Sequence, residues 1–372
     1  MAEYYTNSIS RGKKRERRSR SGSELLFSLL DIISTLAMVL LVFLTITTII
    51  CQYISPEKSG VLSVIALGAP AIYLFDIVVM FYWVVRWRWY RATVMIVTVV
   101  LGLFYLSRYY KIEIDRKYDT SFMERRYTKI MTYNVREGKS EGLAEYIKKH
   151  NPDILCLQEI NIGGDTWIAL TERYQTTYMP KVCVGGNQIL SKYRIIRSGG
   201  IDTLQHRSSV WADLKIKDDT IRVVSLHLQT TSISPKDTQF IEQHEYIGDR
   251  ERDSKLRSIV ERLVENNRKR AVQAGLVADF LEKSPYTTIV CGDFNDVPLS
   301  YTYNSIKRGL NDTFSKMADG FAYTYNMRYG VLRIDNILVS PSIEVVSYEV
   351  DNSVDFSDHY PVISRVKFNP NI

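Results

Sequence analysis

Three long apolar runs dominate the first third of the chain. Residues 32–56 contain no charged side chain and are rich in Leu, Ile and Val. A helix of this length can cross the roughly 30 Å hydrocarbon core of a bilayer. A second run is interrupted only by Asp76, and a third is shorter but bracketed by Arg91 and Arg108, whose long side chains can reach the membrane surface. The pattern predicts transmembrane helices at about 30–54, 61–85 and 92–107.

Basic residues around these runs predict their orientation. The arm before the first run, RGKKRERRSR at 11–20, and the loop with Arg86, Arg88 and Arg91 are basic, whereas the first loop carries only Lys58. Because basic loops stay in the cytoplasm, three spans would place residues 1–23 there as a disordered tail and export the C-terminal part to the periplasmic side. Several basic residues between 108 and 126 oppose this. If the third run lies flat at the interface, the C-terminal part is cytoplasmic.

At about residue 128 the pattern changes to short apolar strands that end in polar residues. Strands at 129–135 and 154–158 are separated by a helix, which Ser140 can cap, and they end in Asn134 and Glu159. The pattern predicts further strands at 177–184, 188–190, 210–216, 221–228, 289–291, 333–339 and 363–368. A strand–helix–strand arrangement with polar residues at the carboxyl edge is typical of a layered α/β site.

Two segments between these strands have a different character. Residues 229–256 mix charges without a clear period, which indicates a lid or an irregular loop. The apolar residues that follow predict a long helix, with a basic cluster on its solvent side at Arg262, Arg268, Lys269 and Arg270. A second helix, capped by Ser300, is expected through Ile306.

Charge and cysteine content exclude some functions. The net charge of +7 lies entirely within residues 1–127, since residues 128–372 carry equal numbers of basic and acidic side chains. The high isoelectric point therefore does not argue for nucleic-acid binding by the C-terminal part. The four cysteines show no CxxC spacing, so neither a metal cluster nor a disulfide framework is expected.

The stretch TTIVCGDFND at 287–296 carries the first candidate chemistry. A buried strand stops at Gly292 and then presents Asp293 and Asn295, whose side chains share one face because they are two residues apart. The carboxylate can hold a water or a cation, and the amide can hydrogen-bond an oxyanion. Taken alone, the stretch could equally be an Asp/Asn turn after a strand. Later in the chain, Asp335 lies in a strand, and Asp358 and His359 are adjacent.

Seven short motifs occur in the order found in one enzyme family: TYN at 132–134, LQE at 157–159, ILS at 189–191, LHL at 226–228, GDFN at 292–295, RIDNIL at 333–338 and SDHYPV at 357–362. Residues 128–370 thus resemble the endonuclease/exonuclease/phosphatase superfamily. The resemblance implies a four-layer α-β-β-α sandwich, in which two packed mixed sheets are flanked by helices. It also implies hydrolysis of a phosphate ester by metal-assisted attack of water.

By resemblance, Glu159 is the chief metal ligand, Asn134 lies beside it and Asp358 completes the site. Convergent carboxylates without Cys ligands favour Mg²⁺, with Mn²⁺ as a substitute, over Zn²⁺. Asp293 would orient or deprotonate the water. The expected contacts to phosphate oxygens come from Asn295 and His227, and Asp335 would polarise His359. Residue type leaves open whether Asp293 or His359 carries the proton.

These features predict a membrane-anchored, Mg²⁺-dependent phosphoesterase or phosphodiesterase, with a membrane region at 24–107, a connector at 108–127 and a catalytic domain at 128–372. Its partners would be the lipid bilayer and a phosphoester substrate, which the sequence leaves open among nucleic acid, phospholipid head group and nucleotide. No obligate protein partner is indicated. The alternative is a catalytically silent, membrane-anchored binding or scaffold protein that retains the fold.

Overall fold

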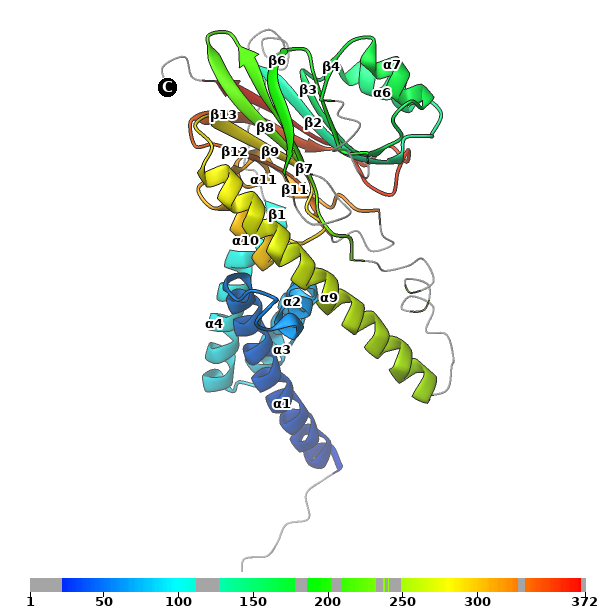
Figure 1. Ribbon diagram of the computed structural model, residues 1–372. Coiled ribbons are helices and arrows are strands. Elements are labelled where there is room, and N and C mark those ends of the chain that lie inside the picture. Colours follow the sequence, from blue (N-terminus) through cyan, green and yellow to red (C-terminus); the bar gives the residue numbers. More distant parts are fainter. Residues whose placement is uncertain are drawn as a thin grey trace, which may run out of the picture.

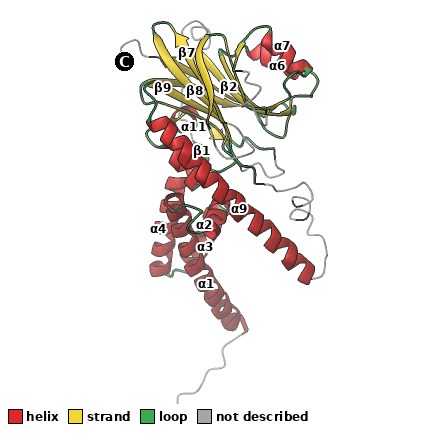
Figure 2. Ribbon diagram, in the orientation of Figure 1, coloured by secondary structure: helices red, strands yellow, loops and turns green. Residues whose placement is uncertain are grey.

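The computed structural model describes residues 22–111, 127–177, 186–201, 209–231, 237, 240, 249–326 and 332–368. Two six-stranded mixed sheets pack face to face and carry helices on their outer faces, above a group of N-terminal helices (Figures 1 and 2). This arrangement confirms the predicted pair of packed mixed sheets flanked by helices.

Both sheets are built around a central parallel pair of strands. The first sheet has the order β13-β14-β2-β3-β5-β4, with strands Ile343–Val350, Val362–Phe368, Thr128–Glu137, Ile154–Ile160, Gln188–Ser191 and Gln175–Thr176. The second has the order β10-β12-β9-β8-β7-β6, with strands Asn311–Asp312, Asp335–Val339, Thr287–Asp293, Asp219–His227, Ser209–Ile216 and Arg194–Ile201. The pairs β2–β3 and β8–β9 are parallel, and all other neighbours are antiparallel.

The alternation of side chains along each strand separates three cores. On β2, Ile130 packs between the sheets, whereas Met131 and Tyr133 face the opposite way. That outer face is covered by α6 (Leu143–His150) and α7 (Asp165–Thr171). The outer face of β8 and β9 packs against α9 (Asp249–Glu282) and α10 (Tyr301–Lys307). The two-residue period of the strands thus lets each sheet bury both of its faces.

Helical crossovers bring strand ends to the same edge. The chain passes through α6 between β2 and β3 and through α9 between β8 and β9, so the two strands of each parallel pair end at the same edge of their sheet. A hydrogen bond between Asn134 of β2 and Asp293 of β9 brings the two edges together. Gly292 allows the backbone of β9 to approach β8 closely, because a Cβ there would lie 2.0 Å from the carbonyl oxygen of Leu226. Three small elements complete this part of the fold: β1 (Tyr110–Lys111), β11 (Gly320–Phe321) and α11 (Thr313–Met317).

Two of the N-terminal helices are long and apolar enough to cross a membrane. They are the segment Gly22–Tyr53, made of α1 (Gly22–Ile50) and η1 (Cys51–Tyr53), and α4 (Trp89–Leu106). The predicted single helix at 61–85 is wrong, because the chain breaks into α2 (Gly60–Leu67) and α3 (Ala69–Val85), bent by 65°. Gly68 and Pro70 lie at the break, where a proline within the first turn starts a helix readily. A third crossing exists only if this bent pair counts as one span.

These helices have surfaces that water would not stabilise. Large apolar side chains are exposed along α1, α3 and α4, for example Leu40, Phe43, Leu74, Phe81 and Phe104, each more than half exposed. Soluble proteins rarely expose contiguous apolar surface on this scale, whereas lipid-facing helices require it.

The N-terminal helices pack directly on the sandwich. Cys51, Ala66, Ala69 and Tyr73 share a buried apolar cluster with residues that follow β9, among them Leu299. Arg108 extends this contact, because its guanidinium donates to the side chains of Gln52 (2.9 Å) and Asn304 (3.1 Å) and to the carbonyl of Pro298 (3.1 Å). The segment that follows β9, which begins just after Asp293, is therefore held between the sheets and the N-terminal helices.

Four local predictions differ from the structure or lie largely outside the described residues. Ser140 does not cap α6, because its hydroxyl donates to the carbonyl of Phe356, whereas Ser300 does cap α10 by accepting from the backbone N–H of Tyr303. Arg270, expected on the solvent side of α9, is fully buried. Most of the predicted strand at 177–184 lies outside the described residues, and so does much of the segment 229–256.

Candidate active site

The polar residues expected at strand ends lie at one edge of the sandwich. Asn134 and Glu159 lie near the carboxyl ends of β2 and β3. His227 and Asp293 are the last residues of β8 and β9 and are direct partners in the parallel register. Parallel neighbours end side by side, so each crossover delivers two functional side chains to the same place.

The remaining predicted residues reach this edge from antiparallel strands. Asp335 begins β12 and is the register partner of Asp293. Asp358 and His359 lie in the turn before β14. All the predicted site residues except Asp335 line a single cavity of about 310 Å³: Asn134, Glu159, His227, Asp293, Asn295, Asp358 and His359.

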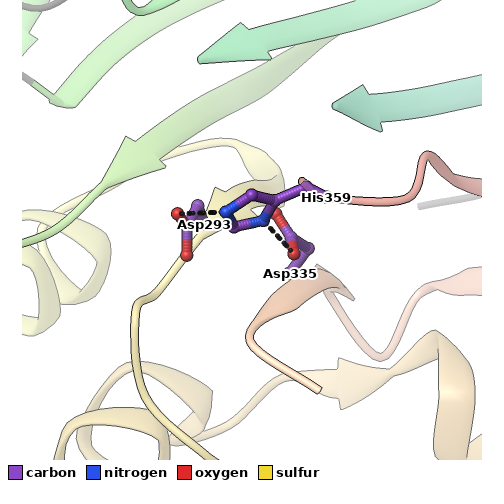
Figure 3. Close-up of side chains that lie close together, drawn as sticks. All are labelled: Asp293, Asp335 and His359. Atoms are coloured by element: carbon purple, nitrogen blue, oxygen red, sulfur yellow. Dashed lines mark hydrogen bonds and ion pairs between the residues drawn. The ribbon is translucent and has the colours of Figure 1, made fainter. Parts of the chain in front are cut away.

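Asp335 lies behind His359 and orients its ring. The Nδ1 atom of His359 is 2.9 Å from Oδ2 of Asp335, and its Nε2 atom is 3.8 Å from Oδ2 of Asp293 (Figure 3). Burial lowers the pKa of His359, but the negative charges of Asp335 and Asp293 outweigh it and raise the pKa to about 10. Burial, reinforced by the charge of Asp335, raises the pKa of Asp293 to about 7. The two carboxylates therefore favour the protonated form of the imidazole.

Asn134 connects the two parallel pairs. Its Nδ2 atom donates to Oε1 of Glu159 at 3.3 Å and to Oδ2 of Asp293 at 3.2 Å. His227 approaches the same two acids, with its Nε2 atom 3.4 Å from Glu159 and 3.8 Å from Asp293. One amide and one imidazole thus hold carboxylates from different sheets at a fixed separation.

Asn295 holds Asp293 from the other side. Its backbone N–H donates to Oδ1 of Asp293 at 2.8 Å, and its Nδ2 atom donates to Oδ2 of Asp293 and to the carbonyl of Leu228, both at 3.0 Å. Asn295 and Glu159 both have positive backbone φ angles, +52° and +59°, which residues other than glycine rarely adopt. Strain of this kind is concentrated at functional sites, where it fixes side-chain direction.

A buried polar network lies between the sheets, next to these strand ends. The side chain of Gln158 donates to the hydroxyls of Thr132 (3.2 Å) and Ser225 (3.1 Å), and Ser225 in turn donates to Asn187 (2.6 Å). These groups join β2, β3 and β8 across the space between the sheets. Because buried polar groups are costly when unpaired, the network fixes the register of one sheet against the other.

Two groups of side chains could hold a metal ion. Ligand atoms of Asp293, Asp335 and His359 all lie within 4.8 Å of one another. Oδ1 of Asp335 is buried and has no hydrogen-bond partner. The second group is the predicted set of Asn134, Glu159 and Asp358, which line the cavity and whose two acidic side chains are 34% and 35% exposed. A protonated His359 opposes a cation in the first group, whereas the second offers oxygens that suit a hard divalent cation.

Several residues that line the cavity were not predicted. Arg136 follows Asn134 by two residues and places its guanidinium 3.8 Å from Oδ2 of Asp358, and the same-face spacing in TYNVR is a signal for it. The ring of Tyr325 packs edge-on against His359 with centroids 4.9 Å apart. Leu67, from the N-terminal helices, also lines the cavity, and nothing in its local sequence indicates this.

Comparison with known proteins identifies the family. The endonuclease/exonuclease/phosphatase family matches residues 131–359, and a domain of unknown function (DUF8431) matches residues 30–109. No curated protein matches the chain.

Solved structures with a similar arrangement cover about two thirds of this chain. One is an endonuclease/exonuclease/phosphatase family protein from Bacteroides thetaiotaomicron, with 19% identity, a TM-score of 0.47, and coverage of 65% of this chain and 98% of that chain. Another is D. rerio TDP2 humanized by 14 mutations, with 15% identity, a TM-score of 0.47, and coverage of 65% and 99%. A third is the human nocturnin catalytic domain with a bound sulfate anion, with 20% identity, a TM-score of 0.44, and coverage of 65% and 95%.

The family match spans more than half of the chain and includes every strand end that lines the cavity. This chain therefore belongs to the endonuclease/exonuclease/phosphatase family, whose members are hydrolases of phosphate esters.

Proposed function

We propose that this protein is a membrane-anchored, divalent-metal-dependent phosphoesterase or phosphodiesterase. The observation that carries the proposal is the position of Asp293, whose carboxylate is held by Asn134 and Asn295 and faces His227 and His359 in one cavity. A carboxylate held in this way can direct a water molecule at a phosphorus atom placed between the two histidines.

The charges divide the proton-transfer roles. With its pKa raised to about 7, Asp293 can accept a proton from water, whereas the raised pKa of His359 keeps that ring a donor. His359 would therefore hydrogen-bond a phosphate oxygen and donate to the leaving oxygen, while Asp335 holds its Nδ1 atom. His227 would contact a second oxygen. Both amide hydrogens of Asn295 are engaged with Asp293 and Leu228, so we assign it to holding Asp293 rather than to the phosphate.

We assign the metal to Asn134, Glu159 and Asp358. When bound there, Mg²⁺ or Mn²⁺ would neutralise the phosphate and the charge that develops in the transition state. Oxygen ligands from an amide and two carboxylates suit such a cation, and Asn134 already aligns Glu159 with Asp293. Arg136 would take part by balancing the charge of Asp358.

Metal dependence gives the direct test. The full chain, purified in detergent and stripped with EDTA, is expected to release p-nitrophenol from bis-p-nitrophenyl phosphate only after Mg²⁺ or Mn²⁺ is restored. Glu159→Gln should raise the Mg²⁺ concentration for half-maximal rate at least about 10-fold, since it removes one anionic ligand. Activity that survives EDTA would contradict the assignment. If the wild-type chain releases no p-nitrophenol with any divalent cation, this result would instead support a binding or scaffold protein.

We further propose that α1, the bent pair α2–α3 taken as one span, and α4 each cross the membrane. The catalytic part, residues 128–372, would then lie on the extracytoplasmic, periplasmic side. At one end of these helices Asp31 pairs with Arg86 at 3.0 Å and accepts from Tyr82 at 2.7 Å. At the other end Cys51 packs on the sandwich. The basic turn at 86–88 and the sandwich therefore lie at opposite ends of the bundle, as Figure 1 illustrates, and basic turns remain in the cytoplasm.

Cysteine labelling tests this orientation. In a Cys183→Ser background, a cysteine in place of the exposed Asp219 should react with a membrane-impermeant maleimide in intact cells whose outer membrane is permeabilised. A cysteine in place of the exposed Arg88 should react only after lysis. The reverse pattern would place the catalytic part in the cytoplasm.

A further inference from the structure

Part of the wall of the cavity that holds the catalytic residues is apolar. Leu67, Leu332 and Ile334 line it together with the acids, amides and imidazoles described above. Leu67 is the last residue of α2 and therefore comes from the N-terminal helices rather than from the sandwich. Figure 1 shows α2 directly beneath the sandwich, beside α9. The site is thus completed by a part of the chain that lies outside the matched family segment.

The position of Leu67 is built into the packing of α2 on α9. A Cβ at Gly60 would lie 2.2 Å from Cγ1 of Val264, so glycine permits the close approach of the two helices. Asn267 donates to the hydroxyl of Ser63 at 2.6 Å across the same contact. Leu67 itself packs against the buried residues Phe240, Ile259 and Leu263. These contacts fix the end of α2 in the wall of the cavity.

The apolar wall continues into the helices that we assign to the membrane. Leu67 and Leu332 pack against the cluster that contains Ala66, Ala69 and Tyr73. A few residues further along α3, Leu74 and Phe75 are 61% and 58% exposed, as lipid-facing side chains would be. The 65° bend between α2 and α3 lies beside this wall. The cavity is therefore located where the bundle meets the sandwich, at the level expected for lipid head groups.

The charges of the cavity do not suit a polyanion. Of the described residues that line it, only Arg136 is an arginine or lysine, and it faces Asp358. Residues 128–372 carry no net charge. Nucleic-acid affinity depends on several cationic contacts to successive phosphates, so such a substrate would gain little here. An aliphatic wall, by contrast, is stabilised when an apolar group covers it.

We propose that the substrate is a lipid phosphoester of the bilayer, with its phosphate among the catalytic residues and its apolar portion against Leu67, Leu332 and Ile334. This inference rests on the proposed phosphoesterase function and names its substrate class. In the reaction, the oxygen of water forms a bond to phosphorus while an ester P–O bond breaks. The water proton passes to Asp293, and the departing oxygen receives a proton from His359.

A chain-length series tests the inference on the full chain in detergent micelles. The substrates are p-nitrophenyl phosphodiesters whose second ester is methyl, butyl or octyl. We expect kcat/KM of the wild-type protein to rise by at least about tenfold from methyl to octyl, because each buried methylene favours binding. Leu67→Asn should flatten this dependence. Val61→Asn, on an exposed position of the same helix outside the cavity, should retain it.

The outcomes separate the two proposals. Equal kcat/KM for all three esters in the wild-type protein would overturn the lipid inference while leaving the phosphoesterase function intact, and this comparison does not depend on any variant folding. Faster hydrolysis of a single-stranded oligonucleotide than of the octyl ester would overturn it in favour of a nuclease. Absence of p-nitrophenol release from every ester, with metal present, would reject the proposed function itself. Release of phosphorylated products from phospholipid vesicles would extend the result to a natural surface.

Discussion

Asp293→Ala is expected to lower kcat for bis-p-nitrophenyl phosphate by about 10²–10⁴-fold, the range for loss of a positioned general base. The carboxylate is fully held by the fold: Oδ1 accepts the backbone N–H of Asn295, and Oδ2 accepts from Asn134 and Asn295. Alanine would remove the group that directs water, while the cavity walls remain in place. KM should change much less than kcat, because the groups assigned to the phosphate are separate.

The fold should survive this change. A buried carboxylate whose pKa is raised by desolvation and by Asp335 is not a strongly stabilising group. A matched control is Asp219→Ala, which replaces an exposed aspartate at the first residue of β8, the end remote from His227. Its kcat should equal that of the wild-type protein, and both variants should show wild-type near-ultraviolet circular dichroism. A folded Asp293→Ala protein with undiminished kcat would remove Asp293 from the mechanism.

The convergence of the candidate site residues could be predicted because most of them end apolar strands. Asn134, Glu159, His227 and Asp293 each follow or close a run of buried residues, and the parallel pairing of their strands brings those ends together. Local sequence therefore contained both the residue types and the reason for their convergence. The roles that we propose for individual residues were less predictable. For example, one amide hydrogen of Asn295 is donated to the carbonyl of Leu228, which is 67 residues away along the chain.

Features that depend on packing between distant segments could not be predicted from the local sequence. Arg270 occupies a polar position in the helical pattern of α9, yet it is buried because it donates to the carbonyl of Gln229 at 2.7 Å and lies 3.5 Å from Asp296. Leu67 has no local signal for an active site, since its role arises only when α2 docks on α9. The break after α2 did carry a signal in Gly68 and Pro70, but hydropathy alone merges the two helices.

A second large effect is expected from Arg333, which lies between the catalytic edge and the N-terminal helices. Arg333→Met should lower the free energy of unfolding by about 3–5 kcal/mol, the cost of breaking a buried ion pair from one side. The Nη2 atom of Arg333 lies 2.9 Å from Oδ2 of Asp312, with the two side chains 1% and 0% exposed. Nη1 also donates to Asn336 at 2.7 Å, and the guanidinium lies over the ring of Phe314 at 4.4 Å. Methionine fills much of the volume but leaves Asp312 charged without its cation.

A second substitution separates the charge from the packing. Asp312 also caps α11 by accepting the backbone N–H of Phe314 and accepts the hydroxyl of Tyr303 at 2.6 Å, and asparagine can keep an acceptor oxygen for one of them. Because Arg333→Met/Asp312→Asn contains no unpaired buried charge, it should be more stable than Arg333→Met alone. Guanidinium unfolding in detergent, followed by near-ultraviolet circular dichroism, measures both. If Arg333→Met costs less than about 1 kcal/mol, Asp312 must be hydrated when Arg333 is absent.

Since Arg333 also donates to the carbonyl of Arg108 at 3.3 Å and precedes Asp335 by two residues, its loss should loosen the N-terminal helices and the catalytic edge together.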